Sequence, residues 1–254
     1  MTEWSPSQYL KFADERTRPA ADLLARVPLA APAAIVDLGC GPGNSTELLA
    51  RRWPDARLIG VDSSAAMLAQ AASDHPEWIW EQADIAVWSP AAPVDLIFAN
   101  AALHWVPDHG TLLPRLFGHV ASGGALAVQM PRNFDAPSHA LMRRVADAPR
   151  WRRRLAGVVG RPVAEPAAYY DLLAPLARRL DLWESEYMHV LDGVDAILEW
   201  VRGTGLRPYL DPLDPAEREA FTDRYLAALA DAYPRAADGK VLFPFKRLFL
   251  VAMR

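Results

Sequence analysis

The chain has 254 residues, of which 52% are hydrophobic and 23% are charged, a composition typical of a globular domain and unlike a disordered or collagen-like chain. Its 27 basic and 31 acidic residues give a formal net charge of −4, which disfavours nucleic-acid binding. One cysteine excludes a disulfide framework and a multi-cysteine metal site. No apolar run is long enough for a membrane span or a secretion signal, so we expect a cytoplasmic protein.

The first 130 residues alternate predicted helices and strands. Residues 1–28 have the apolar spacing of a helix. Short apolar segments typical of buried strands then occur at 33–38, 57–62, 78–84, 94–100 and 125–130, with helical patterns between them, including one at 112–120. This alternation is typical of crossover connections between parallel strands, with helices on both faces of the sheet.

The regular alternation stops after Pro131. Two further strands are expected at 180–191 and 246–252. The expected fold is one α/β domain (1–254) with a doubly wound, mostly parallel seven-stranded sheet. Its expected parts are an N-terminal helical cover (1–28), a cofactor-binding core (33–130), and a substrate cover from two inserted segments, the Pro- and Arg-rich 131–175 and the helical 192–240.

A glycine-rich turn follows the first expected strand. Asp37, Gly39, Gly41 and Gly43 form the pattern D-x-G-x-G-x-G before a helix. Glycines at such a position let backbone N–H groups approach a ligand at the helix N-terminus. The turn lacks the G-x-G-x-x-G spacing of dinucleotide-binding proteins and the G-K-[ST] ending of triphosphate loops, so an NAD-linked oxidoreductase is disfavoured.

Polar residues also end the next three expected strands. Asp62, at the end of the second strand, can accept hydrogen bonds from both hydroxyls of a ribose. Asp84 ends the third strand, where an adenine edge can lie, and Asn100 ends the fourth. Because doubly wound sheets bind ligands at the carboxyl ends of their strands, these positions predict a nucleoside-containing ligand.

The turn D-L-G-C-G-P-G at 37–43, with Asp62 and Asp84, resembles the class I S-adenosylmethionine-dependent methyltransferases. A wider set of segments resembles the trans-aconitate 2-methyltransferase family over nearly the whole chain. These segments are Tyr9–Phe12, Arg16–Pro19, Asp37–Ser45, Ile97–Ala101, Trp105–His109, Ala127–Pro131 and Glu199–Pro208.

The resemblance implies methyl transfer from S-adenosylmethionine to one carboxylate of trans-aconitate or a closely related small polycarboxylic acid. The products would be a monomethyl ester and S-adenosylhomocysteine. A carboxylate is ionised at neutral pH, so no general base is required, and positioning and desolvation should supply the catalysis. One alternative is a methyltransferase of the same fold acting on a hydroxyl or carbon, with His104 or His189 as base. Another is a non-enzymatic S-adenosylmethionine-binding module.

Together, the pattern and the resemblance predict two sets of site residues and no metal, because the six histidines lack the paired spacing of metal ligands. The expected cofactor-binding residues are Tyr9, Arg16, Arg18, Asp37, Gly39, Cys40, Gly41, Asn44, Asp62, Ser63, Met67, Asp84, Ile85, Asn100 and Ala101. The expected substrate-binding residues are His104, Trp105, Gln129, Arg132, Tyr187, His189, Trp200, Arg207 and Tyr209, with His104 and Trp105 positioning the reacting carboxylate. The only partner expected is the small polycarboxylate, with neither nucleic acid nor membrane.

Overall fold

A computed structural model describes residues 13–158 and 163–254. The chain divides into two compact units. Unit 1 contains the described residues up to Pro131 together with Val163–Ser185 and Arg247–Arg254, and unit 2 contains the described residues of Arg132–Pro162 and Glu186–Lys246.

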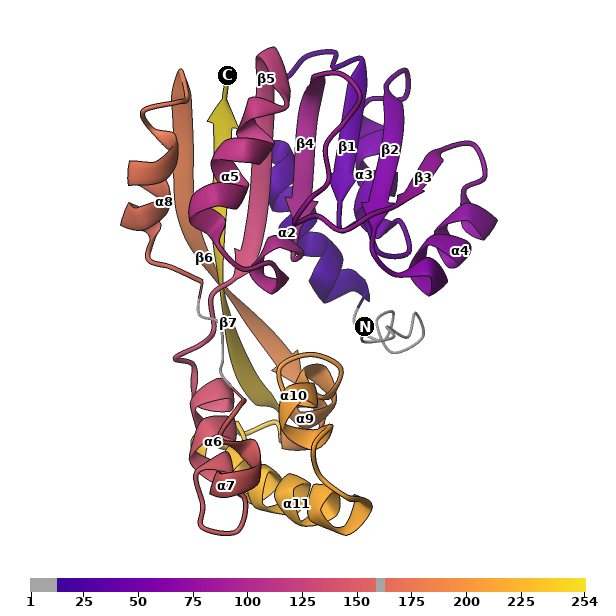
Figure 1. Cartoon of the computed structure of the whole chain (residues 1–254). Helices are drawn as coiled ribbons and strands as arrows, with labels where there is room; N and C mark the ends of the chain where they lie inside the picture. Colours follow the sequence, from indigo (N-terminus) through magenta and orange to yellow (C-terminus); the bar gives the residue numbers. More distant parts are fainter. Residues whose placement is uncertain (1–12, 159–162) are drawn as a thin grey trace. The chain divides into compact units, whose positions relative to one another are not determined.

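The sheet has seven strands in the order β3-β2-β1-β4-β5-β7-β6 (Figure 1). Strands β1 to β5 pair in parallel, and β7 runs antiparallel to β5. The chain therefore winds outward in both directions from β1 and β4, which confirms the doubly wound, mostly parallel sheet. The strands are β1 (Ala34–Leu38), β2 (Arg57–Asp62), β3 (Ile79–Gln82), β4 (Val94–Asn100), β5 (Val120–Pro131), β6 (Arg179–Leu191) and β7 (Val241–Met253).

Helices cover both faces of the sheet in unit 1. The apolar residues of α5 (His109–Gly118) and α8 (Pro166–Leu173) share one buried cluster with Val36, Ile97 and Val128 from one face. On the opposite face α2 (Ala13–Ala25) packs against α3 (Asn44–Arg52), and α4 (Ala65–Asp74) packs against β2 and β3. The strands between these layers are buried nearly continuously, as their apolar segments predict.

Unit 2 is mainly helical. Its helices are α6 (Pro137–Ala146), α7 (Arg152–Leu155), α9 (Val194–Arg202), α10 (Arg207–Leu210) and α11 (Pro215–Ala232). Helix α11 packs against α6 and α9, and the edge of the Trp151 ring meets Phe221 with 5.2 Å between ring centroids. The backbone of Ser138 donates to the Tyr233 hydroxyl and accepts from the Tyr225 hydroxyl, so two tyrosines of unit 2 fix the start of α6.

Several elements have different limits from those expected. Strand β3 ends at Gln82, because Asp84 begins a turn in which its carbonyl accepts from Val87 and Trp88. Strand β5 begins at Val120 and contains Gly123 and Gly124 inside it, with an irregular register against β4. Helix α5 starts earlier than the apolar pattern suggests because Asp108 caps it. Strand β7 begins at Val241, five residues before the expected start.

The expected insertions are divided between the units. Residues 166–173 form α8, which belongs to unit 1 and shares its apolar cluster with α5. The described part of 132–158 and the helices between 194 and 232 belong to unit 2. The role of both segments as a substrate cover stays a prediction.

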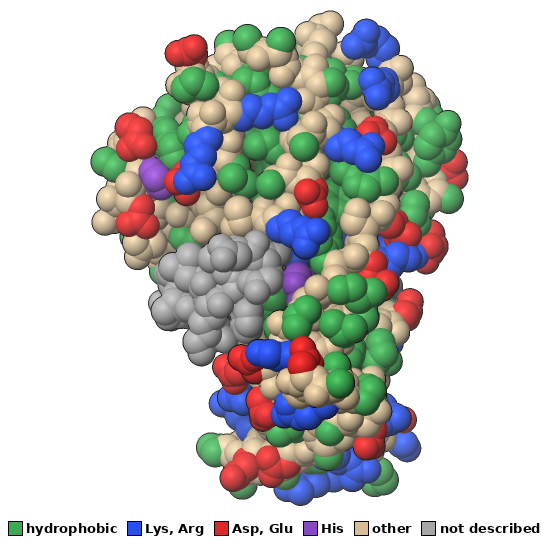
Figure 2. Space-filling model, turned by 180° about the vertical axis from the view of Figure 1, so that it is seen from behind, with side chains coloured by type: hydrophobic (Ala, Val, Ile, Leu, Met, Phe, Trp, Pro, Cys, Tyr) green, Lys and Arg blue, Asp and Glu red, His purple; other side chains and the backbone are tan. Residues whose placement is uncertain are grey.

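Charged side chains of both signs are interspersed over the face shown in Figure 2, in keeping with the small net charge. Among the described residues, no helix combines the length and the apolarity needed to cross a bilayer.

Gly60, in the middle of β2, tests the packing of the sheet. A Cβ at this position would lie 2.3 Å from the Trp80 ring and 3.0 Å from the Cys40 sulfur. We expect Gly60→Val to destabilise the protein by about 2 kcal/mol, because overpacking forces neighbours off their rotamers. In thermal unfolding, Gly118→Ala is the control, since a Cβ there meets nothing within 4 Å. Equal melting temperatures for the two variants would contradict this packing.

Candidate active site

The glycine turn lies between β1 and α3 and is pinned to β2. The N–H groups of Gly39 and Cys40 donate to the Val61 carbonyl at 2.7 and 3.1 Å. Gly39 has φ +74°, and a Cβ on it would lie 2.2 Å from the Ala102 Cβ. Gly41 has φ +55° and open space at its Cβ position, so only its backbone conformation demands glycine. The turn therefore presents bare backbone at the start of α3.

Asp37, the last polar residue of β1, is a buried carboxylate below this turn. Its Oδ2 accepts from the hydroxyls of Ser45 and Thr46, both at 2.7 Å. Its Oδ1 is buried and has no hydrogen-bond partner among the described residues. Burial raises the pKa of Asp37 to about 6, against the lowering effect of the two hydroxyls. A cationic donor reaching Oδ1 would satisfy this oxygen and favour the ionised form.

Asp62 connects the end of β2 to the glycine turn. Its Oδ2 accepts from the Gly41 N–H at 3.0 Å, and its Oδ1 accepts from the Ser64 N–H at 2.8 Å. These two bonds fix the plane of the carboxylate and leave each oxygen a further lone pair for a ligand hydroxyl. The partner at Ser64 also caps α4, whose first turn carries the buried Met67. Ser63 is exposed beside it.

Asp84 and Ile85 lie in the turn after β3. The Asp84 side chain is exposed, and its Oδ1 accepts from the Ala86 N–H at 2.9 Å. Ile85 is buried, and its side chain would be 3.5 Å from a Cβ on Gly39. An acidic edge and an apolar wall therefore occur together near the glycine turn, as expected for an adenine-binding position.

The ends of β4 and β5 carry two buried amides. Asn100 pairs with Gln129 in the parallel register, and both side chains are buried. Neither the Oδ1 of Asn100 nor the Nε2 of Gln129 has a hydrogen-bond partner among the described residues. Ala101 follows with φ +53°, an uncommon value for a residue with a side chain, and its N–H donates to the Gln129 carbonyl. Strain of this kind is often stored at functional sites.

His104 and Trp105 follow directly in the short helix η1 (Leu103–Trp105). Their ring centroids lie 4.7 Å apart, and Trp105 is 44% exposed, a high value for a tryptophan. A core-packing role for Trp105 is therefore disfavoured. Asp37, Asp62, Asn100, Gln129 and these two rings all belong to unit 1.

The remaining expected substrate residues belong to unit 2. Tyr187 and His189 lie on the same buried face of β6, as their period-two spacing predicts, and the His189 ring lies 4.6 Å from that of Trp200. Arg132 is half-buried and donates its backbone N–H to the Lys246 carbonyl. Tyr209 is buried against Phe221, which raises the pKa of its hydroxyl.

A methyltransferase domain family model matches residues 35–124, from β1 to the first half of β5. A trans-aconitate 2-methyltransferase of Azoarcus sp. (strain BH72) is 59% identical over an alignment that covers 100% of both chains. The chain belongs to the trans-aconitate 2-methyltransferase family.

Solved structures similar to this family member share its fold at low sequence identity. The YcgJ protein of Bacillus subtilis is 15% identical with a TM-score of 0.63, covering 93% of this chain and 98% of its own. A phosphoethanolamine N-methyltransferase 2 of Haemonchus contortus, solved with S-adenosylhomocysteine, is 12% identical with a TM-score of 0.55. The match covers 93% of this chain and 52% of that one. The fold is thus that of the class I methyltransferases.

The other residues expected to bind the cofactor differ in how far they are buried. Arg18 lies on the exposed side of α2, whereas Tyr9 and the side chain of Arg16 lie outside the described residues. Asn44 begins α3 with its Oδ1 buried. Cys40 is buried, and desolvation raises the pKa of its thiol, so the side chain stays neutral in the turn. Over 13–158 and 163–254, no three potential ligand side chains cluster as a metal site.

The sequence reasoning missed Ser45 and Thr46 as partners of Asp37. A signal existed, because two adjacent hydroxyl residues stand in the first helical turn after the glycines. Their role depends on the path of the glycine turn, which brings the start of α3 into contact with Asp37 of β1.

Asp37 predicts a measurable pH effect on stability. Its pKa of about 6 in the folded protein exceeds the ordinary value of 3.8, so the folded state binds the proton more tightly. The stabilising contribution is therefore present below pH 3.8 and lost as the pH rises through 6. Between pH 4.5 and 7.5 we expect the wild type to lose about 2 kcal/mol relative to Asp37→Asn in denaturant unfolding.

The Ser45→Ala/Thr46→Val variant should enlarge this loss, since both groups that favour the ionised carboxylate are removed. Parallel pH profiles for the wild type and Asp37→Asn would show that the carboxyl group is not perturbed.

Proposed function

We propose that this protein is an S-adenosylmethionine-dependent O-methyltransferase that methylates one carboxylate of trans-aconitate or a closely related small polycarboxylic acid. The observation that carries the proposal is the 59% identity, over the full length of both chains, to a relative named trans-aconitate 2-methyltransferase. The expected products are the monomethyl ester and S-adenosylhomocysteine.

The geometry of unit 1 supports S-adenosylmethionine as the methyl donor. The bare backbone of the glycine turn can approach the ligand closely, and Asp62 offers a fixed carboxylate for the ribose hydroxyls. Asp84 and Ile85 suit the adenine edge and face. The unpartnered Oδ1 of Asp37 suits the ammonium group of the methionine part. We also propose contacts from Tyr9, Arg16, Arg18, Cys40, Asn44, Ser63, Met67, Asn100 and Ala101, as the family resemblance implies.

When bound, the donor supplies a methyl group on a sulfonium, which passes to a carboxylate oxygen while the electron pair of the broken S–C bond stays on sulfur. The attacking carboxylate is already an anion at neutral pH, so the protein has no proton to remove. Its residues must hold one oxygen in line, neutralise the other carboxylates and exclude water. We propose that His104 and Trp105, just beyond β4, position the reacting carboxylate.

For the remaining negative charge of the substrate we propose Gln129, Arg132, Tyr187, His189, Trp200, Arg207 and Tyr209. Arginine suits this role because its planar fork matches a carboxylate. Methylation of a hydroxyl or carbon would instead need a base, for which His104 and His189 are the candidates.

Transfer of a labelled methyl group to a panel of acids, phenols and alcohols tests the proposal. We expect turnover with trans-aconitate and little with the uncharged hydroxyl compounds. Turnover of a phenol or alcohol in place of every carboxylic acid would replace this function with hydroxyl methylation.

Asp62→Asn should weaken S-adenosylhomocysteine binding by about tenfold in calorimetry, since a carboxylate acceptor is lost.

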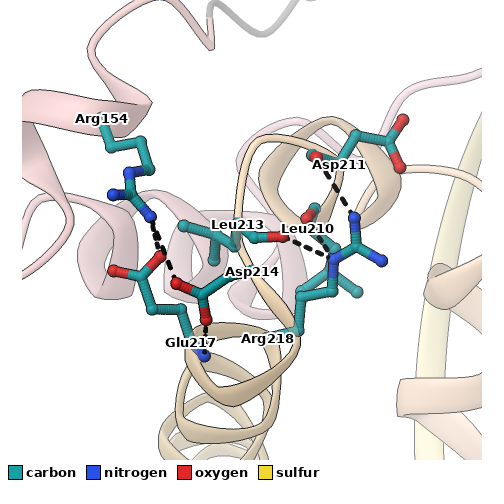
Figure 3. A network of polar contacts seen from close by, with 7 residues as sticks. All are labelled: Arg154, Leu210, Asp211, Leu213, Asp214, Glu217 and Arg218. Atoms are coloured by element: carbon teal, nitrogen blue, oxygen red, sulfur yellow. Dashed lines mark hydrogen bonds and ion pairs between the residues drawn. The ribbon is translucent and has the colours of Figure 1, made fainter.

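Arg207 stands at the start of α10, whose other end is fixed by a polar network. The Arg218 side chain caps the end of α10, because it donates to the carbonyls of Leu210, Asp211 and Leu213 (Figure 3). Asp214 caps α11 through the Glu217 N–H, and Arg154 pairs with Glu217 and Asp214 (Figure 3). Arg154 therefore joins α7 to the start of α11 within unit 2.

The guanidinium of Arg207 is about one-third exposed and lies 3.5 Å from the Asp211 carboxylate. An exposed pair of this kind is weak, so a substrate carboxylate can compete for the guanidinium. We expect Arg207→Ala to raise the KM for trans-aconitate about tenfold or more with cofactor affinity unchanged.

Asp211→Ala is the matched variant in these steady-state kinetics, and it should not raise the KM, because it removes only the competing carboxylate. An unchanged KM in Arg207→Ala would show that Arg207 does not bind the acid.

A further inference from the structure

A buried arginine that the sequence reasoning did not select lies at the ligand edge of the sheet in unit 1. Arg247 of β7 is only 3% exposed. Arginine is almost never fully buried unless its guanidinium is paired with another polar or charged group. Its Nη1 lies 3.4 Å from the Oε1 of Gln129, a residue with no exposed surface. This contact joins β7 to the carboxyl end of β5.

The strand register places this arginine in a row of polar side chains. Asn100 pairs with Gln129, Gln129 pairs with Phe249, and Arg247 stands two residues from Phe249 on the same face of β7. The row therefore runs from Asn100 through Gln129 to Arg247 across three neighbouring strands. Just beneath it the Phe249 ring stacks on Trp183 at 4.9 Å, so the row has an apolar floor.

The contact with Arg247 also fixes the orientation of the Gln129 amide. Because a guanidinium only donates, the oxygen of the amide faces Arg247 and the NH2 group points elsewhere. That NH2 group is buried and has no partner among the described residues. A guanidinium and an amide donor side by side in a low-polarity setting form a binding site for an anion.

We propose that Arg247, oriented by Gln129, binds a carboxylate of the acid substrate that is not the one methylated. This inference rests on the proposed function. A guanidinium that pairs with a carboxylate occupies its lone pairs and lowers its nucleophilicity, so the carboxylate held by Arg247 is one that does not react.

The methionine part of the cofactor also carries a carboxylate, which is the alternative ligand for Arg247. In the strand order, β7 lies four strand spacings from β2, which carries Asp62. At ~4.8 Å each these spacings amount to ~19 Å. The seven bonds from the ribose ring carbons to the methionine carboxylate span about 10 Å when extended. The Arg247 guanidinium reaches back to Gln129 on β5, which narrows this gap. An ammonium group held by Asp37 on β1, as proposed above, still keeps the adjoining methionine carboxylate about two strand spacings, ~10 Å, from β5. We therefore assign Arg247 to the substrate.

The test measures acid binding and turnover in parallel. Calorimetry on the protein loaded with S-adenosylhomocysteine compares trans-aconitate with mesaconate, glutaconate and itaconate, each of which lacks a different one of its three carboxylates. In Arg247→Met we expect trans-aconitate to bind about 10- to 100-fold more weakly, with S-adenosylhomocysteine affinity unchanged. One dicarboxylate, the one lacking the carboxylate that Arg247 holds, should bind both proteins equally.

Two further variants separate this role from a structural one. Arg247→Lys keeps the charge without the fork and should give an intermediate affinity. Arg26→Met is the matched control, because Arg26 is an exposed arginine of the same face, paired with Asp181 and stacked over Trp183. It removes the same charge and should leave acid binding unchanged. Should Arg247→Met fail to fold, Gln129→Leu must show the same selective loss.

Three results would overturn the proposal. The first is unchanged trans-aconitate affinity in a folded Arg247→Met, and the second is an equal loss for all three dicarboxylates. The third is weakened S-adenosylhomocysteine binding, which would assign Arg247 to the cofactor. If the wild-type protein binds trans-aconitate through Arg247 but does not methylate it, the proposed function is wrong and the binding site stands.

Discussion

The buried carboxylate of Asp37 is the interaction on which the ligand edge depends. The hydroxyls of Ser45 and Thr46, in the first turn of α3, donate to one of its oxygens. These bonds fix the path of the glycine turn, which connects Asp37 on β1 to α3. Asp62 then fastens the same turn to the end of β2 through the Gly41 N–H. Burying an incompletely paired carboxylate costs stability, which its raised pKa reports. A site that binds a cationic ligand recovers this free energy when the ligand is present.

The edge of unit 1 changes character along the strand order. Carboxylates stand at and beyond the ends of β1, β2 and β3, buried amides end β4 and β5, and a buried guanidinium follows on β7. A donor that carries a positive charge and an acceptor that carries several negative charges require such a separation of charge. The parallel strands β1 to β5 bring their carboxyl ends to one edge, and the antiparallel β7 adds Arg247 there by pairing it with Pro131 at the end of β5.

Much of unit 1 could be predicted from sequence because its signals are local. Apolar runs such as Val94–Asn100 and the glycine turn each specify a short piece of backbone, and the alternation of strands and helices then limits the topology. The errors fall where long-range contacts decide. The sequence pattern starts the fifth strand at 125, yet β5 begins at Val120, because Val120 pairs with Val94 of β4 and the backbones of Gly123 and Gly124 hydrogen-bond to Arg254. Asp84 reads as part of a strand, but its hydrogen bonds form a turn.

The amino-acid sequence by itself determined the doubly wound sheet, the glycine turn and the acids at the strand ends, since each depends on residues close together in the chain. Only the tertiary structure showed that Ser45 and Thr46 hold Asp37 and that Arg247 joins Gln129. The last pair is separated by 118 residues. Arg247 stands in an apolar strand with no motif around it. Its burial beside an amide arises from antiparallel pairing between β5 and β7, which no local pattern specifies.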